Sequence, residues 1–170
     1  MNTVTLKKAL VCLEVKETVL VLAGSVILPF LIHLIPPIAG IPLGARLLPM
    51  FYAPLIAIVL FRAHVGIIAA LFAPALNSLL TGHPLPEKVG ILTFELLIFC
   101  IILYLLNRQW KEFWAAAPLA YLLALACASA ALGSMNFFFT TLSVGIPGFL
   151  ALALLNLSLL NFKSKREWKQ

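Results

Sequence analysis

Charged side chains are scarce in this sequence. Only 11% of its 170 residues are Asp, Glu, Lys or Arg, whereas 63% are hydrophobic. A soluble domain usually devotes about 25% of its residues to charge, because its surface faces water. The composition therefore excludes an ordinary soluble domain and predicts an integral membrane protein.

Motifs typical of metal, disulfide and nucleotide chemistry are also missing. The three cysteines, Cys12, Cys100 and Cys127, form no spaced pair, so we expect neither a disulfide framework nor a metal site. The sequence contains no HExxH, GxSxG or CxxC motif, no phosphate loop and no acidic cluster. We therefore expect no cofactor, no metal and no catalytic residues. The cytoplasmic part of the chain is also too short to bind and hydrolyse ATP.

Six apolar segments make up most of the chain. They are residues 18–35, 47–61, 64–80, 89–106, 113–133 and 138–162. Most approach the roughly 20 residues that cross about 30 Å of hydrocarbon. Segment 47–61 is short, and we expect it to extend back to Leu43. The sequence thus predicts an all-α integral membrane protein, with residues 1–170 forming a single compact bundle of six transmembrane helices.

The basic residues indicate how this bundle is oriented. All but two of the 12 Lys and Arg residues flank the first and last segments or lie in the second and fourth connections; Arg46 and Lys88 are the exceptions. Lys and Arg favour the cytoplasmic side, which predicts cytoplasmic termini in a multi-pass protein of the plasma (inner) membrane. Residues 1–17 are either a short interfacial helix or a tail, and residues 163–170 are a cytoplasmic tail. We expect no nucleic-acid partner, because no basic face carries interleaved aromatic residues.

Glu95 is the only formally charged residue inside a membrane-length segment. A carboxylate in hydrocarbon costs about 2.5–3.5 kcal/mol on insertion scales, so it usually has a partner or a function. In the predicted orientation it lies about 9 Å below the outer boundary. Other polar side chains share this outer half, and polar groups in lipid face the bundle interior or a wet cavity. We therefore predict an outward-open cavity with these substrate-binding candidates: Glu95, Asn77, His33, Arg46, His83, Asn136 and Thr140.

Each candidate also has a purely structural interpretation. His33 is placed to reach the lipid headgroups, and Asn77 to bond a neighbouring helix. Glu95 has Thr93 or a facing helix as alternative partners. The hydroxyls of Thr140, Thr141 and Ser143 can bond the carbonyls of their own helix.

Two further patterns concern packing and access. Alanines recur at positions 116, 120, 124 and 128, and such small residues let helices approach closely. We favour packing inside the bundle for this ladder over docking of a partner subunit. The first outer connection, residues 36–46, is apolar and rich in proline and glycine, so it is either a lid over the cavity or a tightly packed connection.

An ordered series of motifs runs from the first outer connection to the fourth segment. It comprises Leu47-Leu48-Pro49-Met50, Pro54, Gly66, Pro74, Asn77, residues 79–86 (LLTGHPLP) and Phe94-Glu95-Leu96. This series resembles the substrate-binding (S) subunits of energy-coupling factor (ECF) vitamin transporters. It covers about a third of the chain, and the length and six predicted segments extend the likeness to the whole.

The resemblance implies a binding subunit without enzymatic activity of its own. Such subunits capture a water-soluble vitamin or precursor from outside, then associate with a transmembrane coupling subunit and two cytoplasmic ATPases. By this resemblance the first outer loop is the gate, and Glu95 lines the site.

Two other functions stay open at this point. One is a small intramembrane enzyme, or an accessory subunit of one, that uses Glu95 as acid or base. The other is a structural subunit whose polar residues only hold helices together. For a binding subunit, Arg46 and His83 favour an anionic group, whereas Glu95 favours a hydrogen-bond donor or a cation. A carboxylated or zwitterionic vitamin, of the nicotinate or pantothenate type, satisfies both.

Overall fold

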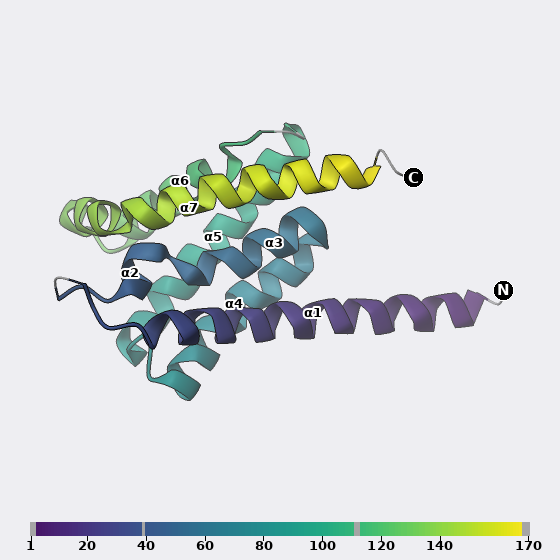
Figure 1. Ribbon diagram of the computed structural model, residues 1–170, viewed down its shortest axis with the longest axis horizontal. Coiled ribbons are helices and arrows are strands. Elements are labelled where there is room, and N and C mark those ends of the chain that lie inside the picture. The colour runs from purple at the N-terminus through teal and green to yellow at the C-terminus, as the bar shows by residue number, and fades with distance from the viewer. Residues whose placement is uncertain (1–2, 39, 111–112, 168–170) are drawn as a thin grey trace.

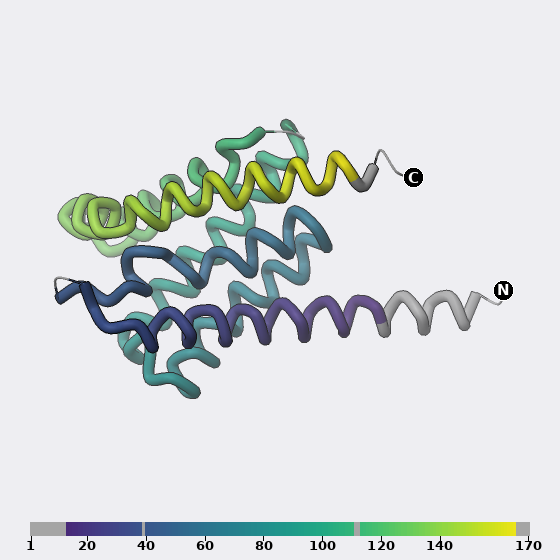
Figure 2. The backbone as a smooth tube through the Cα atoms, in the orientation of Figure 1, coloured from purple at the N-terminus to yellow at the C-terminus, as the bar shows by residue number. Residues whose placement is uncertain are grey.

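The computed structural model describes the backbone of residues 3–38, 40–110 and 113–167 (Figure 1). Within these ranges it describes side chains from residue 13 to residue 165, the stretch that is coloured in Figure 2. Several residues used above to predict orientation or redox chemistry have side chains outside the described set: Lys7, Lys8, Cys12, Lys111, Arg166 and Lys169.

The described chain is helical throughout and contains no strand (Figure 1). The elements are, in order, α1 (Thr3–His33), α2 (Leu43–Leu47), η1 (Pro49–Phe51), α3 (Tyr52–Leu60), α4 (Ala63–Thr81), α5 (Pro86–Gln109), α6 (Ala116–Ala131) and α7 (Met135–Glu167). The predicted all-α class is confirmed.

Four of the described helices are long and apolar enough to cross a membrane. They contain the segments Leu13–His33, Ala63–Thr81, Pro86–Gln109 and Met135–Lys165. Two shorter apolar helices, Pro49–Leu60 and Ala116–Ala131, fall in the second and fifth apolar segments. Long apolar helices of this kind indicate a membrane protein, and the six-span count stays a prediction.

The second apolar segment is interrupted at Leu48. This residue adopts a left-handed conformation, with φ 54° and ψ 45°, and it separates α2 from η1. A proline disfavours the right-handed helical conformation for the residue that precedes it, and Leu48 precedes Pro49. Helical structure does extend back to Leu43, but the break at Leu48 divides it into α2 and the η1–α3 unit. The hydroxyl of Tyr52 bridges the interruption by donating a hydrogen bond to the carbonyl of Leu47.

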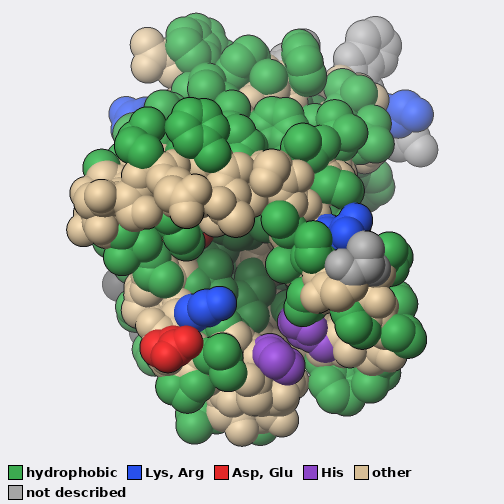
Figure 3. Space-filling view, turned by 90° about the vertical axis from the view of Figure 1, so that its left-hand side faces the viewer, with side chains coloured by type: hydrophobic (Ala, Val, Ile, Leu, Met, Phe, Trp, Pro, Cys, Tyr) green, Lys and Arg blue, Asp and Glu red, His purple; other side chains and the backbone are tan. Residues whose placement is uncertain are grey.

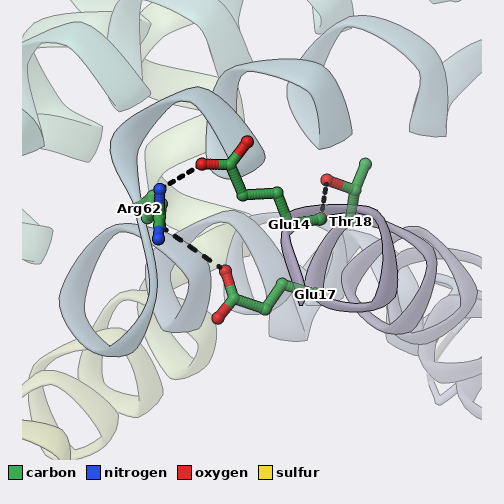
Figure 4. Close-up of polar contacts among 4 residues, drawn as sticks. All are labelled: Glu14, Glu17, Thr18 and Arg62. Carbon is green, nitrogen blue, oxygen red and sulfur yellow. Dashed lines mark hydrogen bonds and ion pairs between the residues drawn. The ribbon is translucent and has the colours of Figure 1, made fainter. Parts of the chain in front are cut away.

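Both chain ends lie at the same end of the molecule (Figure 1). Helix α1 runs without a break from Thr3 through the first apolar segment, and residues 163–167 are the last turns of α7. Arg62, at the corner between α3 and α4, ties this corner to α1 (Figure 4). Its guanidinium donates to Glu14, and its Nε lies 3.9 Å from an Oε of Glu17.

The alanine ladder of α6 faces the interior of the bundle. Ala116, Ala120, Ala124 and Ala128 are all completely buried, and α6 packs between α5 and α7. The prediction that this ladder packs within the bundle is confirmed. Small side chains let the three helices approach closely.

An aromatic cluster joins this core to the other elements. The ring of Phe51 in η1 contacts Phe99 of α5 edge-on, with centroids 5.1 Å apart, and Tyr121 of α6 in the same way at 5.2 Å. Such edge-to-face pairs contribute about 0.5–1.5 kcal/mol beyond area burial. Because Phe51 is the last residue of η1, the cluster packs η1 against α5 and α6.

Candidate functional site

A cavity of about 700 Å³ lies between the helix ends. Figure 3 views the molecule from the end opposite both termini and shows a hollow among hydrophobic side chains, with histidine and a basic side chain beside it. The lining comes from α1, α2, η1, the α4–α5 loop, α5 and α7. Its volume lies within the range of about 300–1,000 Å³ that is usual for small-molecule sites.

Glu95 is the buried charged group of this cavity. It lines the cavity from α5, and only 5% of its surface is exposed. Among the described residues it forms no hydrogen bond or ion pair, neither with Thr93 nor with a facing helix. Tyr121 lies near enough to interact with it electrostatically, and the Tyr121 hydroxyl is itself buried without a hydrogen-bond partner in the described chain. A buried carboxylate without a donor is costly, so this position favours a donor supplied from the cavity.

Helix α5 presents one continuous stripe to the cavity. Lys88, Ile91, Leu92 and Glu95 all line it, and spacings of three, four and seven residues place them on one helical face. Lys88 is exposed and forms no ion pair with any described residue. Sequence reasoning used Lys88 only for orientation. The spacing 88, 91, 92 and 95 is the signal that identifies it as a site residue.

Two histidines meet at the rim. The rings of His33, at the end of α1, and His83, in the α4–α5 loop, stack with centroids 4.9 Å apart and planes 18° apart. Both line the cavity. Gly82 caps α4 in a left-handed conformation, with φ 72°, and turns the chain toward this contact. A helix commonly ends on such a glycine, because no Cβ opposes the positive φ.

Helix α2 covers one side of the cavity. Pro42, Gly44 and Ala45 line it together with Leu48. Gly44 packs directly on His33, since a Cβ at Gly44 would lie 2.6 Å from Cε1 of that imidazole. The part of the first connection nearest α3 is therefore a cavity wall.

Helix α7, which packs against α2, contributes two threonines to the lining. Thr140 and Thr141 both contact the cavity. The hydroxyl of Thr140 donates to the Asn136 side-chain oxygen at 3.5 Å, and Asn136 is exposed and not part of the lining. Ser143 bonds the Thr140 carbonyl at 2.9 Å, which matches its structural interpretation.

Asn77 and Arg46 do not line the cavity. The amide nitrogen of Asn77 is buried and donates to the carbonyls of Ser25, at 2.8 Å, and Ala73, at 2.9 Å, so it joins α4 to α1. Arg46 donates to the Ile38 carbonyl at 3.0 Å, within its own connection. The structure thus brings Glu95, His33, His83 and Thr140 together in one cavity, whereas Asn77, Arg46 and Asn136 are not part of its lining.

Apolar walls with a few polar groups suit binding of a small organic molecule. No group of three His, Cys, Asp or Glu side chains able to hold a metal ion occurs in the described part of the chain. Comparison with protein-family models, curated proteins and solved structures finds no match for this chain. The geometry of the cavity is therefore the basis for assigning a function.

Proposed function

We propose that this protein is a membrane-embedded substrate-binding subunit that captures a small water-soluble molecule from outside the cell for uptake by partner subunits. The observation that carries this proposal is Glu95, a buried carboxylate without a protein partner in the described chain, in a cavity of about 700 Å³. The protein's own role is binding, with no catalytic step.

The proposed topology has six crossings and cytoplasmic termini. Helix α6 has 16 residues and spans about 24 Å, which a locally thinned bilayer accommodates. The α2–η1–α3 unit supplies the second crossing. The chain ends lie at one end of the molecule (Figure 1), as an even number of crossings requires. The cavity at the opposite end then faces outward.

Part of the motif series that resembles the S subunits of ECF vitamin transporters lines this cavity. Pro49 and Met50 of the first motif line it, as do His83, Pro84 and Glu95 of the later ones. This concentration supports a vitamin-like substrate, with a transmembrane coupling subunit and cytoplasmic ATPases as partners. In this proposal the first outer connection, residues 36–46, is the gate, because its last part lines the cavity.

Mass spectrometry of small molecules released from the purified protein tests the proposal. We expect one molecule to be released at near-stoichiometric amounts from the wild type, and to be lost from Leu92→Trp, where an indole fills the cavity. Leu105→Trp is the matched control, because Leu105 lies on the same helix and is 53% exposed. Equal release from the wild type and both variants, or no release from any of them, contradicts the proposal.

A further inference from the structure

Two opposite charges line the cavity at different depths on one helix. Lys88 and Glu95 are seven residues apart on α5, which corresponds to about 10 Å along the helix axis. Lys88 is exposed, whereas Glu95 is 5% exposed. The cavity therefore has a basic mouth and an acidic floor.

Neither charge is neutralised by the protein in the described structure. The ion pairs in the described chain are those of Arg62 with Glu14 and Glu17, at the end near the termini. Lys88 and Glu95 pair neither with each other nor with another described side chain. A bound group that donates a hydrogen bond to Glu95 would offset the cost of burying this carboxylate. An anionic group at the mouth would interact favourably with Lys88, but this interaction would be weaker because solvent screens the exposed charge.

The wall between the two charges is apolar. Ile91 and Leu92 separate them on α5, while Phe51 and Phe137 line the cavity from η1 and α7. The remaining polar groups of the lining are neutral hydroxyls on α7 and the stacked imidazoles at the rim. A bound molecule thus meets a charge at each end and hydrocarbon along its middle.

We infer that the cavity binds a small zwitterion in one orientation, with its ammonium or N–H end at Glu95 and its anionic end at Lys88. The apolar body of the molecule lies along Ile91 and Leu92. This inference rests on the proposed function, and it assigns the substrate class, the spacing of about 10 Å between its charged ends, and Lys88 as the anion-binding residue.

Straight-chain ω-amino acids, from 4-aminobutanoate to 8-aminooctanoate, are suitable probes because they vary only the distance between the two charges. Their methyl esters remove the anion, and their N-acetyl derivatives remove the cation. Binding is measured by calorimetry on the purified full chain in lipid nanodiscs. We expect saturable binding that strengthens with chain length and is weakened by either modification.

Variants assign each end to its residue. Lys88→Gln should weaken binding of the zwitterion about three- to tenfold and should leave binding of the methyl ester unaffected. The loss of affinity for the zwitterion should be smaller at high salt. Glu95→Gln should weaken binding of the zwitterion about 10- to 100-fold and weaken binding of the N-acetyl derivative less, because that derivative keeps an N–H donor but has no positive charge. Lys163→Gln and Glu87→Gln are the controls, because both residues are exposed and neither lines the cavity.

The inference is overturned if no ω-amino acid binds saturably, or if Lys88→Gln prefers the zwitterion over its methyl ester as strongly as the wild type does. Its failure is distinguishable from failure of the proposed function. A released molecule that Leu92→Trp excludes but that lacks an anionic group refutes the zwitterion and leaves the binding subunit standing. If no molecule is released and no probe binds, both fail.

Discussion

Asn77 and Glu95 are both polar side chains buried among apolar helices, but their surroundings differ. The Asn77 amide has two carbonyl acceptors, one of them on another helix. Glu95 borders a cavity, and no described group forms a hydrogen bond or an ion pair with it. The two hydrogen bonds of the Asn77 amide nitrogen join α4 to α1 and contribute to stability, so Asn77 belongs to the packing of α1 on α4, although its Oδ1 has no partner in the described chain. Glu95 is left for a bound molecule.

Replacing Asn77 should therefore affect folding and not binding. We expect Asn77→Ala to lower the free energy of unfolding by about 1–3 kcal/mol, because the carbonyl of Ser25 loses its buried donor. Thermal unfolding of the purified protein measures this, with Asn136→Ala as the exposed control. Weakened substrate binding without a change in stability would return Asn77 to the binding site.

The sequence largely predicted which polar residues gather at one end of the bundle, but it did not predict the face that each residue presents. Glu95, His33, His83 and Thr140 were predicted to lie at a common level, and the structure brings them to one cavity. Asn77 was placed at the same level, yet its side chain points toward α1. The face that a residue presents depends on which helices pack beside it, and a single apolar segment does not carry that information.

At the scale of elements, α2 is held against α7 by a close backbone contact. A Cβ at Gly148 would lie 2.6 Å from the carbonyl carbon of Leu47 and 2.7 Å from the oxygen of Arg46. No larger residue fits there unless α2 shifts. Since α2 forms a wall of the cavity, this contact also positions the site.

Opposite effects are expected from adding the same methyl group at two helical glycines. Gly148→Ala should destabilise the protein by about 1–3 kcal/mol, because it forces the backbone of α2 away. Gly90→Ala is the control: nothing lies within 4 Å of its added Cβ, so it should be neutral or stabilise by about 0.5–1 kcal/mol through helix propensity. Thermal unfolding curves of the two variants compare them. Equal melting temperatures would mean that α2 is free to move aside.

The ion pairs of Arg62 should contribute only modestly. The side chains of Arg62 and Glu14 are 38% and 35% exposed, and pairs that reach solvent contribute about 0.2–1 kcal/mol. We expect Arg62→Gln to lower the free energy of unfolding by that amount at low salt, and by less at high salt. An effect several times larger that persists at high salt would show that this corner is buried against another surface.

The sequence located the elements better than it located their breaks. Alanine spacing on α6 correctly predicted a buried face, because a four-residue repeat keeps side chains on one side of a helix. The interruption at Leu48 does not follow from apolar periodicity. It reflects the constraint that Pro49 places on the residue before it, and it separates α2 from η1.

At the scale of the whole molecule, the number of crossings depends on α6, which is shorter than the four long apolar helices. Whether it crosses the membrane decides on which side α7 begins. The composition alone predicts a membrane protein, but it does not decide the number of crossings of a chain with two short apolar helices. The topology therefore needs a direct test.

Cysteine labelling in intact cells tests the six crossings. In a background without native cysteines, we expect Glu87→Cys and Met135→Cys to react with a membrane-impermeant maleimide from outside. Trp110→Cys and Lys163→Cys should react only after permeabilisation. All four native residues are exposed, and they flank α5, α6 and α7. If residues 110 and 135 were to react from the same side, α6 would not cross.

The most direct test of the account is the affinity of the released molecule for Glu95→Gln, measured by calorimetry. The substitution keeps the shape of the side chain and removes its charge. If Glu95 holds the substrate at the cavity floor, binding should weaken by about 1.5–3 kcal/mol, the contribution of a hydrogen bond to a charged group, while Glu87→Gln should bind as the wild type does. Unchanged affinity in Glu95→Gln would contradict the central claim.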